Sequence, residues 1–404
     1  MAGRKRKGAL SSLSRNTKLL GGVSFLNDAS SEMLEPIVPL FMVNVLGASA
    51  FIVGMLEGWT EIIVAIMRYL SGWFSDKYRS RKKPILFGYA LSTIMKTSFA
   101  LTATWPQFFA AKTVERVGKG IRTPPRDALI GESEPGSRLG AAFGFRKMMD
   151  ATGAIMGPLI AAFLLFFFSG MGEEAIYRTI FIIAVVPAAF GVLVLFLVRE
   201  RSEQMERMVD TKKMFNGELK GFMLVAALFS IGQVGTAFFI LRSSELLPLV
   251  MIPISYLAYN MVYAATAIPM GIMTDRVGPK KMMISAYLFF ALGCLVFAFT
   301  DSALTAFAGF ALLGLFIAII ETTPRVYIVE TVPGHRYASA IGAYQGITGV
   351  LLLPANIIAG LFWGVMFMGA HAPLIVAALI AVASMFLMQF YVKEGKRWRR
   401  AKAP

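Results

Sequence analysis

Apolar residues form long runs along the chain, separated by short stretches that carry charged residues, proline or glycine. A helix needs roughly 20 mostly apolar residues to cross the hydrocarbon core of a bilayer. By this criterion the pattern predicts an all-α membrane protein with twelve transmembrane helices, six on each side of a polar midpoint. The predicted spans are 18–46, 50–75, 83–104, 106–132, 138–168, 175–199, 218–249, 251–274, 280–300, 303–331, 337–367 and 372–393.

The polar midpoint divides the predicted spans into two bundles. Its residues are too polar to cross lipid and are expected to link the halves on the cytoplasmic side. The expected order is a basic N-terminus, a six-helix bundle, the linker, a second six-helix bundle and a basic tail. These parts cover residues 1–17, 18–199, 200–217, 218–393 and 394–404.

The two halves repeat each other. The segment with Gly72 and Asp76 resembles the segment with Gly271 and Asp275 half a chain later, and basic residues follow the aspartate in both. Further matching pairs keep the same order. They are Arg122–Arg126 with Glu321–Arg325, Pro135–Arg138 with Pro333–Arg336, and Pro158 with Pro354. Such internal repeats are typical of transporters built from two similar halves, and both halves here are expected to start on the same side of the membrane.

Composition and charge support a membrane protein and predict its orientation. Hydrophobic residues make up 56% of the chain and charged residues 16%, which lies outside the usual range of a soluble domain. Much of the net charge of +16 comes from the termini and from the loops after even-numbered spans, whereas the opposite loops hold little besides Arg178. The positive-inside rule therefore predicts a multi-pass protein of the cell (inner or cytoplasmic) membrane with both termini in the cytoplasm.

The sequence argues against several other classes of protein. No stretch is long enough for a soluble basic domain, so no nucleic-acid partner is expected. One cysteine and two histidines cannot form a Cys/His metal cluster, and the residues around Lys119 do not complete a phosphate-binding loop. The methionine groups raise transport of a soft metal ion, but they fit helix packing better. We expect no enzyme activity and no cofactor, with a proton gradient as energy source and a small-molecule substrate and the lipid bilayer as partners.

Several motifs resemble the major facilitator superfamily. The loop with Gly72, Asp76 and Arg81 is similar to the signature Gly-x-x-x-Asp-Arg of that family, and the second half keeps a related copy at Gly271, Asp275 and Arg276. The fourth span carries Arg116-Val-Gly-Lys119-Gly120, which is similar to the Arg-x-x-Gln-Gly element, with lysine in place of glutamine. The resemblance implies a twelve-helix transporter that works as a monomer by alternating access.

Two further motifs resemble the drug:proton antiporter group of this superfamily. The fifth span carries Gly153-x-x-x-Gly157-Pro158, although Ala161 and Ala162 replace the glycines that complete the motif. The first span carries a Pro-x-x-Pro element that begins at Pro36. The resemblance implies export of the substrate in exchange for protons.

A conformational latch is expected at the ends of the helices. A carboxylate beside a basic loop can pair with lysine or arginine or cap a neighbouring helix, and such pairs could hold the halves in one of two states. The predicted latch residues are Gly72, Asp76, Arg81, Arg116, Gly271, Asp275 and Arg276. The alternative is that the basic residues only set the topology. Gly153, Gly157 and Pro158 are expected to form a hinge or tight helix contact, although plain packing explains them equally well.

Charged residues inside the spans are functional candidates, because a charge at mid-bilayer costs about 2.5–3.5 kcal/mol on insertion scales. Asp28, Glu32 and Glu35 share one helical face that carries no base. We expect Asp28 and Glu32 to form the proton-coupling site and to bind and release a proton as the cavity changes sides. Arg122 or Arg126 is expected to compete with the proton for these carboxylates.

Local pairing is the alternative role for many of these charges. The i, i+4 spacing predicts ion pairs of Arg146 with Asp150 and of Glu115 with Lys119. A substrate cavity is expected to be strongly charged in the first half and more neutral in the second. Its predicted residues are Asn27, Glu57, Glu61, Arg122, Arg126, Arg146, Asp150, Tyr256, Asn260, Tyr263, Glu321, Arg325 and Gln345.

These features predict a proton-coupled secondary transporter that exports a small organic or amphipathic compound. The arginines of the fourth and fifth spans keep a second reading open, because guanidinium groups bind carboxylates and phosphates with two donors. In that reading the protein takes up or exchanges an organic anion. A membrane sensor that binds its ligand without moving it is a third possibility, since a fold does not fix a function.

Overall fold

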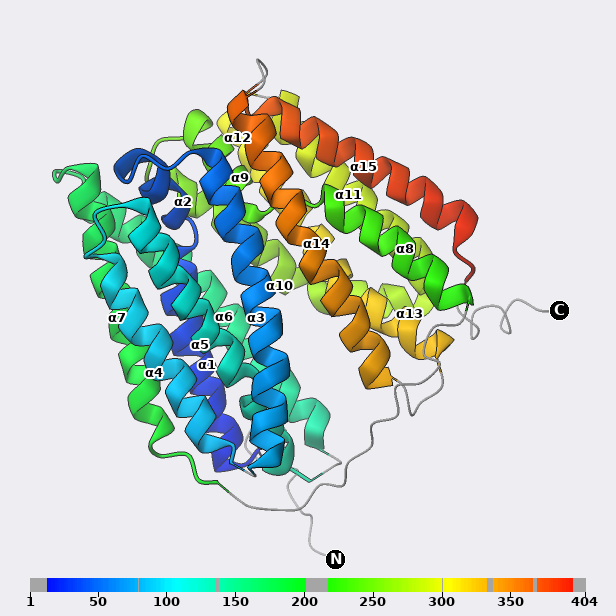
Figure 1. Cartoon of the computed structure of the whole chain (residues 1–404), viewed down its shortest axis with the longest axis horizontal. Helices are drawn as coiled ribbons and strands as arrows, with labels where there is room; N and C mark the ends of the chain where they lie inside the picture. The colour runs from blue at the N-terminus through cyan, green and yellow to red at the C-terminus, as the bar shows by residue number, and fades with distance from the viewer. Residues whose placement is uncertain are drawn as a thin grey trace, which may run out of the picture. The chain divides into compact units, whose positions relative to one another are not determined.

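The computed structural model is built almost wholly from helices. It describes residues 13–78, 80–135, 138–200, 217–299, 301–332, 337–365 and 369–394. Within these ranges there is no β-strand. The helices of the first half are α1 (Arg15–Leu34), α2 (Val38–Leu40), the π-helix η1 (Phe41–Val45), α3 (Ala50–Lys77), α4 (Lys82–Phe99), α5 (Trp105–Glu132), α6 (Leu139–Phe167) and α7 (Glu173–Leu195). Figure 1 shows them in blue to green.

The second half also consists mainly of long helices. They are α8 (Gly217–Gly232), α9 (Thr236–Leu246), α10 (Met251–Val277), α11 (Pro279–Phe299), α12 (Ala303–Ile320), α13 (Thr323–Thr331), α14 (Tyr337–Val365) and α15 (His371–Tyr391). In the part of the chain that the structure describes, nine helical segments are long and apolar enough to cross a membrane. The predicted spans that contain α1, α4 and α5 are not among these nine. The three helices carry charged side chains, among them Lys96, Glu115 and Arg116, which belong to the charged network described below.

Three predicted spans are interrupted in the structure. The first span ends as α1 at Leu34, just before Pro36, whose ring cannot donate the next helical hydrogen bond. The seventh span is divided into α8 and α9 by residues 233–235, and the extended backbone of Gly235 precedes α9. The tenth span is divided into α12 and α13 next to Pro324, which lies in the first turn of α13, where a missing N–H is tolerated. The prediction of continuous helices was therefore wrong at these three places.

The contacts divide the chain into two compact units. Unit 1 comprises Met1–Val38 and Ile63–Met205, and unit 2 comprises Pro39–Ile62 and Glu206–Pro404. Helix α3 contributes its first residues to unit 2 and its remaining residues to unit 1. Residues 39–62 belong to the predicted first bundle by sequence, but by their contacts they group with unit 2.

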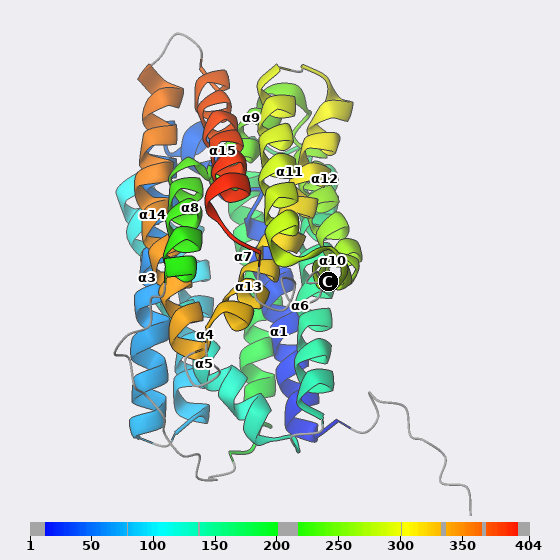
Figure 2. The ribbon, with the colours of Figure 1, turned by 90° about the vertical axis from the view of Figure 1, so that its right-hand side faces the viewer.

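The same helix packing recurs in the two halves. In unit 1, α1 packs against α6 and α7, and α4 packs against α5 and α7. In unit 2, α8 packs against α14 and α15, and α11 packs against α12 and α15; Figure 2 shows this second group from the side. In both halves the first span therefore packs on the fifth and sixth, and the third span on the fourth and sixth. The repeat that the sequence predicts is confirmed as a repeat of helix packing.

Each unit has an apolar core of its own. Leu20, Val23, Tyr89 and Leu129 are fully buried in unit 1. In unit 2, rings on α8, α11 and α12 pack edge to face or tilted, as Phe229 does on Phe290 and Phe316. Large apolar side chains such as Phe163, Ile268 and Leu304 are mostly exposed on single helix faces. Such faces suit contact with lipid tails, in agreement with a multi-pass membrane protein.

Candidate functional site

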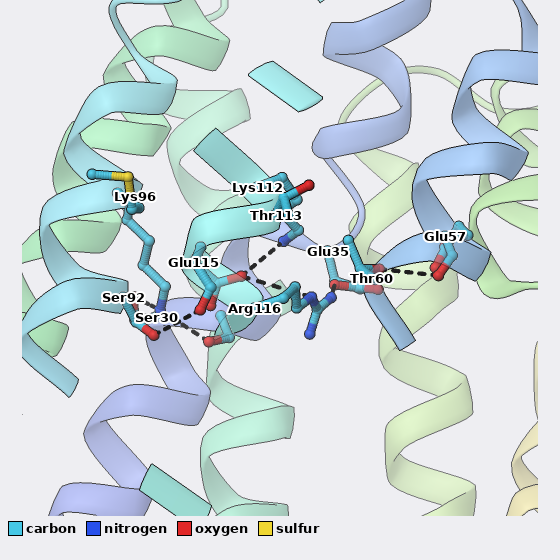
Figure 3. Close-up of polar contacts among 12 residues, drawn as sticks. Ser30, Glu35, Glu57, Thr60, Ser92, Lys96, Lys112, Thr113, Glu115 and Arg116 are labelled. Atoms are coloured by element: carbon cyan, nitrogen blue, oxygen red, sulfur yellow. Dashed lines mark hydrogen bonds and ion pairs between the residues drawn. The ribbon is translucent and has the colours of Figure 1, made fainter. Parts of the chain in front are cut away.

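A buried lysine joins three helices in the middle of unit 1. Lys96 on α4 is 1% exposed, and its Nζ donates hydrogen bonds to the Oγ atoms of Ser30, at 2.8 Å, and Ser31, at 2.9 Å, on α1. The hydroxyl of Ser30 donates in turn to the carbonyl of Ala184 on α7 at 2.5 Å. Figure 3 shows the lysine side chain pointing toward Ser30. A cation in a membrane interior costs free energy, and charged residues at such positions are rare and usually functional. Lys96 is therefore a candidate functional residue.

A row of alternating charges lies on α5 beside this lysine. The Oε2 atom of Glu115, which is 3% exposed, lies 3.7 Å from Lys112 Nζ and 3.7 Å from Arg116 Nε. Arg116 Nη2 lies 3.7 Å from Glu35 Oε2 on α1. Figure 3 shows this row of Lys112, Glu115, Arg116 and Glu35. The backbone carbonyl of Glu115 also accepts a hydrogen bond from Ser92 on α4, so α4 and α5 meet through polar groups.

The two predicted arginines of α5 are buried and bonded. Arg122 Nη1 donates to Ser92 Oγ at 2.7 Å, and its guanidinium lies 4.4 Å from the centre of the Tyr89 ring, a cation–π contact. Arg126 Nε lies 3.0 Å from Asp127 Oδ1, and its Nη1 donates to Ser24 Oγ at 3.2 Å. Both residues belong to the same charged network of α1, α4 and α5.

Helix α6 contributes a further ion pair. Arg146 Nη2 lies 3.4 Å from Asp150 Oδ2, as the i, i+4 spacing predicts. Arg146 Nη1 also lies 3.4 Å from Asp127 Oδ1, which connects α6 to α5. Glu115 lies 3.7 Å from two cations that the sequence did not predict as its partners, Lys112 and Arg116. Its predicted pair with Lys119 stays a prediction.

Asp28 stands among charges of both signs. It accepts a hydrogen bond from Asn27 Nδ2 at 3.2 Å, and it lies close enough to Lys96, Arg122 and Asp150 for their charges to interact. Asp28 and Glu32 are both half-buried. The sequence predicted that an arginine of α5 competes with the proton for Asp28, which stays a prediction, and the structure shows Lys96 on α4 as a further cation whose charge interacts with Asp28.

The glycines of α6 bring this helix into contact with the acidic face of α1. A Cβ atom at Gly153 would lie 2.6 Å from the Phe25 carbonyl oxygen and 3.1 Å from Asp28 Cβ. A Cβ atom at Gly157 would lie 2.6 Å from Met33 N. Only glycine permits this approach of two backbones. Asp28 therefore lies against α6 inside unit 1, and α6 continues without a break through Pro158.

In unit 2, predicted cavity residues meet at the break between α12 and α13. Glu321 lies at this break, and its Oε2 accepts a hydrogen bond from Tyr263 on α10 at 2.6 Å. Glu321, Arg325 and Gln345 line a cavity of about 190 Å³. Tyr256 and Asn260 are buried on α10 and do not line that cavity in the part of the chain described.

The first part of α3 makes a different contact within unit 2. Glu57 Oε1 accepts a hydrogen bond from the backbone N–H of Ala237 at 3.1 Å, and Asn356 Oδ1 accepts one from the N–H of Gly235 at 2.7 Å. Glu57 and Asn356 thus cap the start of α9, where Gly235 supplies no side chain for the purpose. Glu61 is half-buried one turn further along α3.

The predicted latch residues lie in several surroundings. Arg81 Nε lies 2.9 Å from Glu132 Oε1 at the end of α5, and Arg81 Nη1 donates to Ser75 Oγ, both contacts inside unit 1. Arg116 belongs to the charged row on α5, Asp275 and Arg276 are exposed, and the Asp76 side chain lies outside the described residues. A Cβ atom at Gly72 would make ordinary contact with Pro124, and one at Gly271 would meet open space among the described residues. A latch between the halves stays a prediction.

Sequence reasoning gave no role to Lys96, Ser30 or Ser31. Lys96 stands alone among apolar and small residues well inside its span, and a lone charge at such a position is a signal in itself. Its serine partners could not be inferred, because helical periodicity relates residues within one helix and carries no information about which helix lies opposite.

Comparison with known proteins places these features in a family. The model of the Major Facilitator Superfamily matches residues 20–249 and 222–404. An uncharacterised MFS-type transporter, MJ1317, of Methanocaldococcus jannaschii is 33% identical over 388 residues, which cover 94% of this chain and 95% of the relative. The multidrug resistance protein MdtG of Citrobacter koseri is 26% identical over 290 residues, 65% of this chain and 67% of its own.

Solved structures of transporters share the fold. The nucleoside transporter NupG matches with a TM-score of 0.78 at 15% identity, over 93% of this chain and 98% of that one. The POT family transporter PepTSo matches with a TM-score of 0.76 at 12% identity, over 97% and 99%. The twelve predicted spans, their repeat and the buried charges define a membrane transporter. The chain belongs to the major facilitator superfamily.

Proposed function

We propose that this chain is a proton-coupled secondary transporter of the cell membrane that exports a small organic compound by alternating access. Both termini lie in the cytoplasm in this proposal, as the basic loops indicate. The observation that carries the proposal is the position of Asp28, a half-buried carboxylate on the α1 face that packs against α6, within reach of the charges of Lys96, Arg122 and Asp150.

The charged network supplies a physical route to coupling. A carboxylate that shares its cations with another carboxylate changes its interactions when it binds a proton. Protonation of Asp28 would leave Lys96 and Arg122 with less negative charge around them, which favours a rearrangement of α1 against α4 and α5. The antiporter-like motif of α6 and the similarity to MdtG, a multidrug resistance protein, support export as the direction.

A second candidate function rests on the balance of buried charge. Among the described spanning residues of unit 1, the buried charged side chains are four basic ones, Lys96, Lys112, Arg122 and Arg126, and one acidic one, Glu115. An excess of buried cations suits an anionic ligand. The second candidate is therefore proton-linked uptake or exchange of an organic anion.

The experiment uses everted membrane vesicles that contain the protein and generate an acidic lumen. The vesicles are incubated with a small-molecule extract of their host cells, and the compounds that enter the lumen are identified by mass spectrometry. The proposal expects at least one compound to accumulate with the wild type, and neither with Asp28→Asn nor after nigericin has collapsed the pH gradient. Accumulation that survives collapse of the gradient, or no difference from vesicles without the protein, contradicts it. In vesicles whose lumen is loaded with the same extract beforehand, gradient-dependent loss of anions from the lumen would favour the second candidate.

A further inference from the structure

The cavity of unit 2 lies where two spans are interrupted. Gln233 lines it from the break between α8 and α9, and Glu321 lines it from the break between α12 and α13. Irregular backbone at membrane depth is tolerated where it is buried in protein or borders a polar cavity, and transporters place substrate sites at such breaks. The coincidence of two breaks at one cavity therefore indicates a binding site.

One wall of the cavity is aromatic and carries an unsatisfied hydroxyl. The rings of Phe229 on α8 and Tyr287 on α11 stack with centroids 4.3 Å apart and an angle of 22° between their planes. Tyr287 is fully buried, and its hydroxyl has no hydrogen-bond partner among the described residues. A buried hydroxyl without a partner is costly, and a ligand that accepts its hydrogen bond would remove that cost.

The lining of the cavity also carries charges of both signs. Glu321 accepts a hydrogen bond from the hydroxyl of Tyr263, and Arg325 lies four residues further along the chain. Arg325 is exposed, and it takes part in none of the ion pairs found among the described residues. The two charges therefore do not neutralise each other by direct contact. A ligand with one cationic and one anionic group matches this arrangement, whereas a singly charged ligand meets one repulsive partner.

The size of the cavity narrows the class of ligand. Its volume of about 190 Å³ lies below the range of roughly 300–1,000 Å³ that is usual for drug-sized ligands. A compound with one planar ring system and a short charged chain would fill it. Large amphipathic drugs would not enter it whole.

We propose that this cavity binds a small aromatic zwitterion, with its ring on the Phe229–Tyr287 pair, its ammonium group at Glu321 and its carboxylate at Arg325 and the Tyr287 hydroxyl. The further claim that this ligand is the compound that the protein transports rests on the proposed function. Binding itself needs neither a proton gradient nor a direction of transport, so the two can fail separately.

The test measures equilibrium binding to the purified full-length protein in detergent without any gradient. Tritiated tryptophan is the zwitterionic probe, with unlabelled tryptamine, which lacks the carboxylate, indole-3-propionate, which lacks the amine, and alanine, which lacks the ring, as competitors. We expect tryptophan to bind and each competitor to bind at least about tenfold more weakly. Tryptamine and indole-3-propionate each lose one charged contact, and alanine loses the apolar contact of the ring.

Substitutions of the two charges should change selectivity in opposite directions. Arg325→Gln should reduce the preference for tryptophan over tryptamine, and Glu321→Gln should reduce the preference for tryptophan over indole-3-propionate. Tyr287→Phe should weaken tryptophan binding about three- to tenfold, the usual effect of one hydrogen bond. The matched control is Tyr177→Phe, the same change at a fully buried tyrosine of unit 1, which should leave binding unchanged.

Three results would overturn the inference. The first is that tryptophan does not bind, or binds with a Kd above about 1 mM. The second is equal affinity of the wild type for the three indole probes. The third is an equal loss of affinity in Tyr287→Phe and Tyr177→Phe. Because Glu321→Gln and Arg325→Gln predict opposite shifts, a general loss of folding cannot imitate the expected result. Tryptophan binding without gradient-driven transport would support this inference and contradict the proposed function.

Discussion

The ammonium group of Lys96 lies 2.8 Å from the hydroxyl oxygen of Ser30, and that hydroxyl donates its own hydrogen to the carbonyl of Ala184. One side chain of α4 is thereby connected through α1 to α7. Among the described residues, the partners of Lys96 within hydrogen-bond distance are neutral hydroxyls, and the carboxylates whose charges act on it, Glu115 and Asp28, lie at longer range. A change in the charge of either acid therefore changes the electrostatic energy of Lys96 at the contact between α4 and α1.

The Lys96–Ser30 contact predicts stability effects of opposite sign. Ser30→Ala removes an acceptor from a buried ammonium and should lower the free energy of unfolding by about 1–3 kcal/mol. Lys96→Met removes the buried charge and should leave stability equal or higher, while it abolishes gradient-driven transport. The double variant should regain most of the stability lost in Ser30→Ala. Thermal unfolding in detergent measures all three.

The control for this cycle is Ser98→Ala on α4, since the Ser98 hydroxyl donates to the Met95 carbonyl within its own helix. It should change stability by a few tenths of a kcal/mol. A strongly destabilised Lys96→Met, with Ser30→Ala additive to it, would mean that the two side chains are not coupled.

A second prediction concerns the contact of α1 with α6. Gly157→Ala places a methyl group 2.6 Å from Met33 N and 2.8 Å from the Ala29 carbonyl oxygen, both backbone atoms that cannot move aside alone. We expect a loss of about 1–3 kcal/mol in stability, the usual cost of overpacking, or a protein that does not fold. Gly144→Ala on the same helix is the matched control, because a Cβ atom there has no described neighbour within 4 Å. Equal melting temperatures for the two variants would refute the close contact.

The start of α9 gives a third prediction. Glu57→Ala removes the side-chain acceptor for the Ala237 N–H, and caps of this kind are worth about 0.5–2 kcal/mol. Glu57→Gln keeps an oxygen acceptor but loses the charge that favours a helix N-terminus, so it should fall between Glu57→Ala and the wild type. Hydrogen exchange should become faster at residues 236–239 in Glu57→Ala. Glu174→Ala, at an exposed ion pair with Arg178, should leave exchange in α9 unchanged.

How far the sequence predicts this protein depends on the range of each interaction. The approximate limits of nine spans follow from local hydropathy, and the Arg146–Asp150 pair follows from spacing within one helix. The interruption at 233–235 has a local signal in Gly235, but only the structure shows that Glu57 and Asn356, distant in sequence, satisfy the exposed N–H groups. The partners of Lys96 are equally hidden, because they depend on which helices pack together.

A fourth prediction concerns the loop after α5. Glu134 Oε1 accepts hydrogen bonds from the Ser14 N–H at 2.6 Å and the Thr17 hydroxyl at 2.8 Å, at the start of α1. Burial opposes ionisation of this carboxyl, but the hydrogen bonds from Ser14 and Thr17 outweigh it and lower its pKa below the ordinary value of 4.5. The folded state therefore binds this proton less readily than the unfolded state.

The sign of the resulting pH dependence follows directly. A lowered pKa stabilises the fold above the ordinary carboxyl value, and this stabilisation is lost as the pH falls through the lowered pKa. Glu134→Gln should therefore be less stable than the wild type at pH 7, by about 1–3 kcal/mol for a charged hydrogen bond, and the difference should shrink below pH 4.5. Melting temperatures of both proteins between neutral and acidic pH measure it. A difference that is constant with pH would contradict the role of the charge.

The central claim is that Asp28 and Glu32 couple protons to transport, and one comparison in everted vesicles tests it most directly. The compound that the wild type accumulates is measured with Asp28→Asn and Glu32→Gln in two assays, gradient-driven accumulation and exchange of labelled for unlabelled compound without a gradient. The account predicts that accumulation is lost while exchange persists, because the substrate site and the alternation remain. Full gradient-driven accumulation by both variants, at wild-type levels of inserted protein, would contradict it.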